Sequence, residues 1–274
     1  ILMLSGIGNL SELDAVGIVP QKHLPGVGKN LQDHLQARPI FKTDLSTINI
    51  ETSNYFKQAM IGLEYLLRQT GPMTMAASLG TGFLKTDSLQ ETPDIQFHIQ
   101  PFSADNAIEG PHYFSAFTAS VLQLRPESVG HLKLVSANIN DHPEIHPNYL
   151  ATERDQKTIV KGIQIARKVA QFEPLKSHIT EEYQPGNEVA MDDYDSTLNW
   201  ARNTAVTIYH PTGTCKMGSD PMAVVDSRLR VHGLRGLRVA DASIMPTITS
   251  GNTNAPAIMI GEKVSDMILE DIAL

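Results

Sequence analysis

The sequence has little of what several classes of protein require. Its 274 residues include one cysteine, Cys215, so an internal disulfide is impossible and a cysteine-based zinc site is not supported. No apolar run approaches the ~18 residues of a membrane-spanning helix. Acidic residues outnumber basic ones, 30 to 22, and the resulting net charge of -8 disfavours nucleic-acid binding. We therefore expect no transmembrane segment in this chain, no metal site and no nucleic-acid partner.

A glycine-rich dinucleotide fingerprint is also absent. The two nearest segments, residues 26–28 and 80–82, lack the third glycine and the preceding buried strand of Gly-x-Gly-x-x-Gly. The chain begins inside an apolar run at Ile1, which is not how a complete gene product normally starts. These features predict the C-terminal portion of a longer polypeptide, in which any targeting segment would precede Ile1. The low cysteine content favours a reducing compartment, and we expect a cytoplasmic location.

The chain mixes helical and strand patterns. Helices are expected at residues 11–16, 55–69, 152–172 and 196–202 and from residue 254 onward, and strands at residues 95–99, 116–124, 132–135 and 237–240. In the 55–69 helix, six apolar side chains at helical spacing form one stripe: Phe56, Ala59, Met60, Leu63, Leu66 and Leu67. The patterns predict a fold that combines an α/β part with an α+β part.

Three motifs in the last quarter carry the strongest chemical signal. They are Tyr-His-Pro-Thr-Gly-Thr-Cys-Lys-Met-Gly at residues 209–218, Val-Ala-Asp-Ala-Ser-Ile-Met-Pro at 239–246 and Ser-Gly-Asn-Thr-Asn-Ala-Pro at 250–256. They place His210 and Asn254 in turn-rich segments. A neutral imidazole can take a proton near pH 7, and an amide can donate to an oxygen that gains negative charge as the proton leaves. Such a pair suits the oxidation of an alcohol.

The segment around Asn254 is expected to open a helix. Thr253 and Asn254 are good N-cap residues, and Pro256 fits the first turn. A helix start has free N–H groups and the positive end of the dipole, so it can stabilise an electron-rich ring such as a reduced flavin. Taken singly, His210 is more often a loop histidine, and an asparagine-rich turn is more often only a cap. Their joint presence indicates an active site.

The chain resembles the glucose-methanol-choline (GMC) family of flavoprotein oxidoreductases, in its choline-dehydrogenase-like branch. The three motifs carry the resemblance, which extends to residues 2–8, 24–34, 125–130, 143–150 and 225–233 and so spans nearly the whole chain. It implies the C-terminal part of a two-domain FAD-linked enzyme, with an incomplete Rossmann-like FAD domain and a substrate domain containing an antiparallel sheet. Residues 1–34 and 191–274 would belong to the FAD-binding domain, and residues 35–190 to the substrate domain.

The resemblance also implies roles for single residues. His210 would take the hydroxyl proton of a primary or secondary alcohol while hydride leaves its carbon for N5 of FAD, and Asn254 would hold the developing alkoxide. An aldehyde or ketone results, and electrons then pass to oxygen, a quinone or another acceptor. The expected cofactor-binding residues are Asp241, Ala242, Asn252 and Thr253, and the expected substrate-binding residues are Tyr209, Gln96, His98 and Leu79.

Gln96 and His98 have a second interpretation. They alternate with apolar residues in the 95–99 strand, and the simpler reading of that alternation is a sheet with one solvent-exposed face. The resemblance adds the other interpretation, in which Gln96 and His98 line the substrate cavity.

Two alternative functions stay open. Some members of the family keep the flavin without using its redox chemistry, so a hydroxynitrile lyase is one. An inactive fragment without the FAD fingerprint is the other, and we expect the isolated chain to purify without FAD.

The identity of the alcohol is addressed by residues 74–83, which contain no acidic residue. Family members that take choline resemble one another in having an acid in this segment, and a desolvated quaternary ammonium needs a carboxylate or an aromatic cage. Met75, Leu79 and Phe83 fit either an apolar pocket or an ordinary core. We therefore expect neutral aliphatic or aryl alcohols to be preferred to choline.

Overall fold

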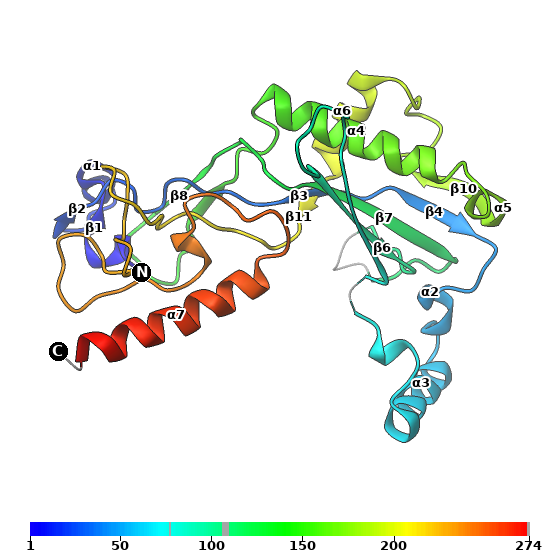
Figure 1. Ribbon diagram of the computed structural model, residues 1–274, viewed down its shortest axis with the longest axis horizontal. Helices are drawn as coiled ribbons and strands as arrows, with labels where there is room; N and C mark the ends of the chain where they lie inside the picture. The colour runs from blue at the N-terminus through cyan, green and yellow to red at the C-terminus, as the bar shows by residue number, and fades with distance from the viewer. Residues whose placement is uncertain (77, 106–109, 273–274) are drawn as a thin grey trace. The chain divides into compact units, whose positions relative to one another are not determined.

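The computed structural model describes residues 1–76, 78–105 and 110–272. They form two compact units, each of which draws on separate parts of the chain (Figure 1). Unit 1 comprises Ile1–His34, Leu124–Asp155 and Thr207–Leu274, and unit 2 comprises Leu35–Gln123 and Gln156–Val206. The first boundary coincides with the predicted one at residue 34. The segment Leu124–Asp155, expected in the substrate domain, packs with unit 1 instead, and residues 191–206 pack with unit 2.

Unit 2 is built on an antiparallel sheet, as the resemblance implied. Its strands are β3 (Leu35–Ala37), β4 (Ile40–Thr43), β5 (Gly80–Leu84), β6 (Ile95–Gln100), β7 (Ala116–Gln123), β10 (Ile179–Gln184) and β11 (Val206–Thr207). The order is β10-β4-β7-β3-β11, with β6 also pairing β7 and β5 pairing β6. The long strand β7 organises the sheet, because β3, β4 and β6 all pair with it.

The helix α4 (Glu153–Val169) begins in unit 1 and packs in unit 2 against β7. The Thr152 hydroxyl accepts from the Asp155 N–H at 3.2 Å, which supports the predicted start. Its apolar face, including Ile159 and Ile163, is buried. A Cβ on Gly162 would lie 2.7 Å from Val121 Cγ2, so the absence of a side chain lets this helix approach the sheet closely.

The predicted 55–69 helix forms as α3 (Tyr55–Arg68), whose start is capped by the Asn54 side chain. Its apolar stripe, however, is not part of the described core. Phe56, Leu66 and Leu67 are 75%, 79% and 74% exposed. Periodicity identified the helix correctly, but it cannot say whether another element covers the apolar face. The remaining helices of unit 2 are α2 (Ile48–Glu51), η2 (Pro72–Thr74), α5 (Leu175–His178) and α6 (Tyr194–Thr204).

The expectation of a solvent-exposed face on the 95–99 strand is wrong. Gln96 is 1% exposed and His98 is buried, and they share one face of the sheet with their cross-strand neighbours Leu122 and Ser120. Apolar residues of the same strand lie on the opposite face, toward Val121. The polar side chains of this face are therefore buried within the protein, and a period-two alternation by itself does not show which face of a sheet is exposed.

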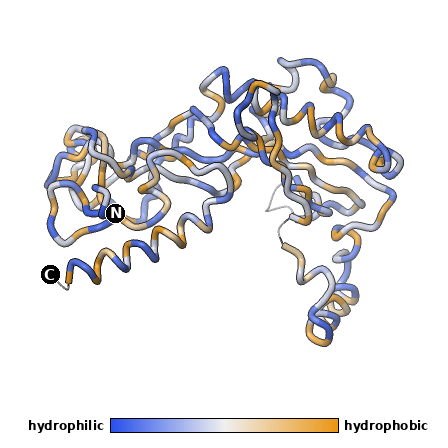
Figure 2. The backbone as a smooth tube through the Cα atoms, in the orientation of Figure 1, coloured by the Kyte–Doolittle hydropathy of each residue, from blue (hydrophilic) through white to orange (hydrophobic). Residues whose placement is uncertain are grey.

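Unit 1 has little regular structure besides its helices. It contains η1 (Met3–Ser5), α1 (Leu10–Ala15), η3 (Ala242–Ile244), α7 (Asn254–Ile272) and two pairs of short strands, β1 (Ile7–Gly8) with β2 (Lys22–His23) and β8 (His131–Lys133) with β9 (Glu144–His146). Hydropathy alternates along α7 (Figure 2), and its buried Ile260 joins a core with Val224, Val225 and Val231. No helix among the described residues is long and apolar enough to cross a membrane.

Two strand predictions in unit 1 need correction. Residues 237–240 do not form a strand, because the one ladder contact that they make within the described part of the chain is an isolated bridge between Arg230 and Arg238. The strand expected at 132–135 begins one residue earlier, as β8, and it pairs with β9 outside the large sheet. A strand needs a partner of matching length, and an apolar alternation alone does not supply one.

Candidate active site

Two segments that are far apart in the sequence, residues 32–34 and residues 208–212, are hydrogen-bonded to each other at the site. Gln32 and Thr212 exchange backbone hydrogen bonds of 3.1 and 2.8 Å, and the Ile208 N–H donates to the His34 carbonyl at 3.1 Å. The Gln32 side chain adds two further contacts, to the Pro126 carbonyl and from the Ile248 N–H. Residues 32–34 therefore hold the loop that carries His210.

Asp33 fixes the conformation of that loop. Its buried carboxylate accepts from the His210 N–H at 2.9 Å, from the Thr207 hydroxyl at 2.5 Å and from the Tyr149 hydroxyl. Burial raises the pKa of Tyr149 above its ordinary value, and the hydrogen bond to Asp33 raises it further. Tyr209 has φ of +64°, a left-handed conformation that costs about 1–2 kcal/mol. Its N–H donates to Thr207 at 2.8 Å, so the network around Asp33 maintains this turn.

His210 is buried and contacts two side chains. Its Nδ1 lies 3.0 Å from Nδ1 of His34, and its Nε2 lies 3.3 Å from Nδ2 of Asn252. Burial lowers the pKa of His210 below its ordinary value, and the negative charge of Asp33 partly opposes that shift. The imidazole is therefore mostly neutral at pH 7 and able to accept a proton.

The structure brings His210 to Asn252 rather than to Asn254. Asn254 is exposed and is the first residue of α7, as the N-cap pattern indicated, and its side chain has no hydrogen bond among the described residues. Thr253 is buried, and its carbonyl accepts from the Ala257 N–H. Of the two asparagines, Asn252 was expected to contact the cofactor, and its amide is the one beside the imidazole.

Asp241 and Ala242 lie against the other side of the His210 loop. The Asp241 carboxylate accepts from the Ser243 N–H at 2.8 Å and so caps η3, while the Ala242 carbonyl accepts from the Gly213 N–H at 3.4 Å. Gly213 has φ of +88°, and a Cβ there would lie 2.2 Å from the Asn30 carbonyl oxygen. Only glycine fits this crossing of three segments.

The predicted substrate-binding residues fall into both units. Tyr209 belongs to unit 1 and is exposed. Gln96, His98 and Leu79 belong to unit 2, where His98 Nδ1 lies 3.3 Å from the Ser78 hydroxyl. Leu79 is exposed and lines a cavity of about 550 Å³ together with Met75, Ser78 and Pro101. Ala77, in the segment expected to meet the substrate, lies outside the described residues.

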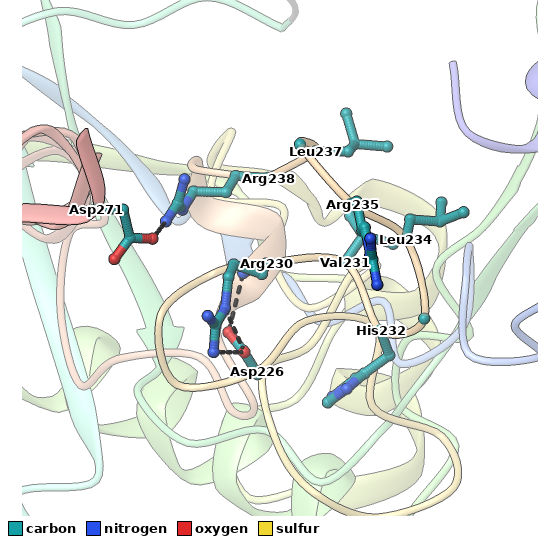
Figure 3. A pocket seen from close by; sticks show the side chains of 11 residues that line it. Asp226, Arg230, Val231, His232, Leu234, Arg235, Leu237, Arg238 and Asp271 are labelled. Carbon is teal, nitrogen blue, oxygen red and sulfur yellow. Dashed lines mark hydrogen bonds and ion pairs between the residues drawn. The ribbon is translucent and has the colours of Figure 1, made fainter. Parts of the chain in front are cut away.

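A second cavity, of about 420 Å³, lies in unit 1 (Figure 3). Arginines contribute to its wall, but Arg230 is paired with Asp226 at 2.8 Å and Arg238 is paired with Asp271. The Arg238–Asp271 pair ties the loop to α7, whereas the Arg230–Asp226 pair lies within the loop. The groups of the chemical site, His210 and Asn252, do not line this cavity.

Sequence reasoning missed the roles of Gln32, Asp33 and His34. These residues were part of the family resemblance, but no chemistry was assigned to them. The available signal was a run of three polar residues directly after Leu31, and all three are buried. Consecutive buried polar residues require hydrogen-bond partners, which here come from the His210 loop.

Comparisons with known proteins identify relatives of this chain. A family model described as GMC oxidoreductase matches residues 126–261. The chain is similar to choline dehydrogenase, mitochondrial, of Homo sapiens, with 43% identity over 100% of this chain and 46% of that protein. It is similar to alcohol dehydrogenase [acceptor] of Pseudomonas putida, with 39% identity over 99% of this chain and 49% of that protein.

A solved structure of formate oxidase from Aspergillus oryzae RIB40, a variant studied for the effect of mutation on FAD modification, matches with a TM-score of 0.89 at 26% identity. The match covers 98% of this chain and 52% of that one. The chain thus spans about half the length of the relatives that it matches. The motif at residues 209–218 lies within the matched family domain, and the chain belongs to the GMC oxidoreductase family.

Proposed function

We propose that this chain is the catalytic C-terminal part of an FAD-dependent alcohol oxidoreductase, which oxidises a CH–OH group to an aldehyde or ketone. The observation that carries the proposal is the contact between His210 Nε2 and the Asn252 amide, on a loop held by buried hydrogen bonds. A neutral histidine beside an amide donor provides a base and a donor for the resulting alkoxide.

The residues next to this pair fit a flavin. The first N–H groups of α7 have no intrahelical acceptors and form the positive end of the helix dipole. Thr249 Oγ1 is buried without a partner among the described residues, and a Cβ on Gly251 would meet open space. Asn252 and Thr253 would hold the ring, and Asp241 and Ala242 the ribityl and pyrophosphate groups. When bound, FAD would supply the hydride acceptor.

The proton chemistry follows from the two side chains. An alcohol oxygen placed between them would donate its proton to Nε2 of His210 and accept an N–H bond from Asn252. As the proton moves to the imidazole, the oxygen gains negative charge, and the amide bond strengthens. Asn252 therefore takes the role that the sequence had assigned to Asn254. The acceptor that would reoxidise the enzyme is oxygen, a quinone or another oxidant.

The test is anaerobic rapid mixing of the full-length holoenzyme with a primary alcohol, with flavin absorbance as the signal. His210→Ala should slow flavin reduction about 100-fold to 10,000-fold while FAD stays bound, since loss of a general base has that size. His142→Ala, a change at an exposed histidine, is the matched control and should react like the parent. Unchanged reduction in the His210 variant would refute the assignment, and a parent whose flavin is not bleached by any alcohol would favour the lyase alternative.

A further inference from the structure

His34 is the least exposed titratable side chain around the site, with 0% of its surface accessible. It makes two contacts through its ring nitrogens. Nε2 lies 3.1 Å from the Leu124 carbonyl oxygen, and Nδ1 lies 3.0 Å from Nδ1 of His210. The two rings meet edge to face, with an interplanar angle of 84°. Perpendicular rings can still form an Nδ1–H···Nδ1 hydrogen bond, because the line between the two nitrogens can lie in both ring planes.

The Leu124 carbonyl determines where the proton on His34 lies. A carbonyl oxygen can only accept, so His34 Nε2 must carry the hydrogen. A fully buried imidazolium is costly, which favours the neutral ring, and the neutral ring with its proton on Nε2 has a lone pair on Nδ1. That lone pair faces His210 and requires a donor there. His210 must therefore be protonated at Nδ1.

Protonation at Nδ1 leaves the lone pair of neutral His210 on Nε2, where the Asn252 amide lies at 3.3 Å. One orientation of the chain of contacts satisfies every member: Asn252 donates to His210, His210 donates to His34, and His34 donates to Leu124. The opposite orientation fails at its end, because the carbonyl has no proton to give.

We propose that His34 is a positioning residue that fixes the tautomer of His210, so that the basic nitrogen is the one facing Asn252. This inference rests on the proposed function for its consequence in catalysis, but the tautomer itself is independent of any substrate. When Nε2 of His210 takes a proton, its Nδ1–H still has His34 as acceptor, so the bond persists in the imidazolium form.

Two variants separate this role from a purely structural one. His34→Asn can place Oδ1 near the position of Nδ1 and so keep an acceptor for His210, although it does not reach Leu124. His34→Leu has no acceptor and leaves His210 free to exchange tautomers. Both lose the bond to the Leu124 carbonyl, so any effect of that loss on stability is common to them.

The first measurement is the tautomer of His210 in the full-length holoenzyme, from nitrogen-15 histidine spectra assigned by comparison with His210→Ala. We expect Nδ1–H in the parent and in His34→Asn, and a mixture or Nε2–H in His34→Leu. His142→Ala should leave the His210 signals unchanged. An Nε2–H tautomer in the parent would overturn the inference, as would a His34→Leu spectrum identical to that of the parent.

The second measurement is anaerobic flavin reduction. We expect His34→Leu to be slower by about 10-fold to 1,000-fold and His34→Asn by less than about 10-fold, compared with ~10⁴ when the orienting carboxylate of a serine protease is replaced. Equal losses in the two variants would show a structural role and overturn the inference. If the tautomers behave as expected but His210→Ala still reduces flavin normally, the proposed function fails and the tautomer assignment stands.

Discussion

Replacement of Asp33 should lower the free energy needed to open the His210 loop, and the hydrogen bonds that Asp33 accepts set the size of this loss. Asp33→Ala removes the acceptor of three donors: the buried His210 N–H and the partly buried hydroxyls of Thr207 and Tyr149. An unsatisfied buried donor costs ~1–3 kcal/mol, and the hydroxyls are closer to the lower figure because water can reach them. The sum is about 4 kcal/mol.

Asp33→Asn is the matched control. Its Oδ1 can still accept from the His210 N–H, and its Nδ2 has two hydrogens for the two hydroxyl oxygens, which can rotate to accept them. The network keeps its number of bonds and loses only the strengthening that the negative charge provides. We expect a loss of about 1 kcal/mol.

Hydrogen exchange of residues 205–214, followed by mass spectrometry on the full-length holoenzyme, measures this loss directly. Because 1.4 kcal/mol corresponds to about a factor of ten, exchange of this segment should accelerate about 1,000-fold in Asp33→Ala and about 5-fold in Asp33→Asn. A peptide from α4 serves as the internal reference and should be unchanged. Equal exchange rates in the two variants, or a segment that exchanges no faster in Asp33→Ala than in the parent, would contradict this role of Asp33.

Three further predictions concern the chemistry. Asn252→Ala should slow anaerobic flavin reduction about 100-fold, since loss of one oxyanion donor costs ~10²–10³, whereas Asn254→Ala should do less; the reverse order in stopped-flow traces would restore Asn254 to the role predicted from sequence. The pH profile of kcat/KM should rise to its plateau with an apparent pKa below about 6.5, because burial lowers the pKa of His210 and the base is active when neutral; neighbouring Asp33 opposes the shift, so Asp33→Asn should move the profile lower still, and a midpoint above 7 in the parent would contradict the assignment. Medium-chain or aryl alcohols should have higher kcat/KM than choline in steady-state assays, since residues 74–83 contain no acid; a higher value for choline than for every neutral alcohol tested would reverse this expectation.

The sequence by itself determined the family, the antiparallel sheet of unit 2 and most helices. These depend on local information: helical spacing from Tyr55 to Arg68, caps such as Thr152 at α4, and motifs whose residue types suit one chemistry. His210 was identifiable for the same reason, because a histidine in a glycine-rich turn with a companion asparagine motif is a local pattern.

Only the tertiary structure decided which side chains meet. Asn252 and Asn254 are two residues apart, so composition cannot separate them, whereas the turn before α7 directs the Asn252 amide, and not that of Asn254, to the imidazole. His34 lies far from His210 in sequence, and the pairing of residue 32 with residue 212 joins them. The burial of Gln96 and the exposure of the apolar stripe of α3 have the same origin as this pairing of distant segments. All three depend on which surfaces pack together, and no single window of sequence contains that information.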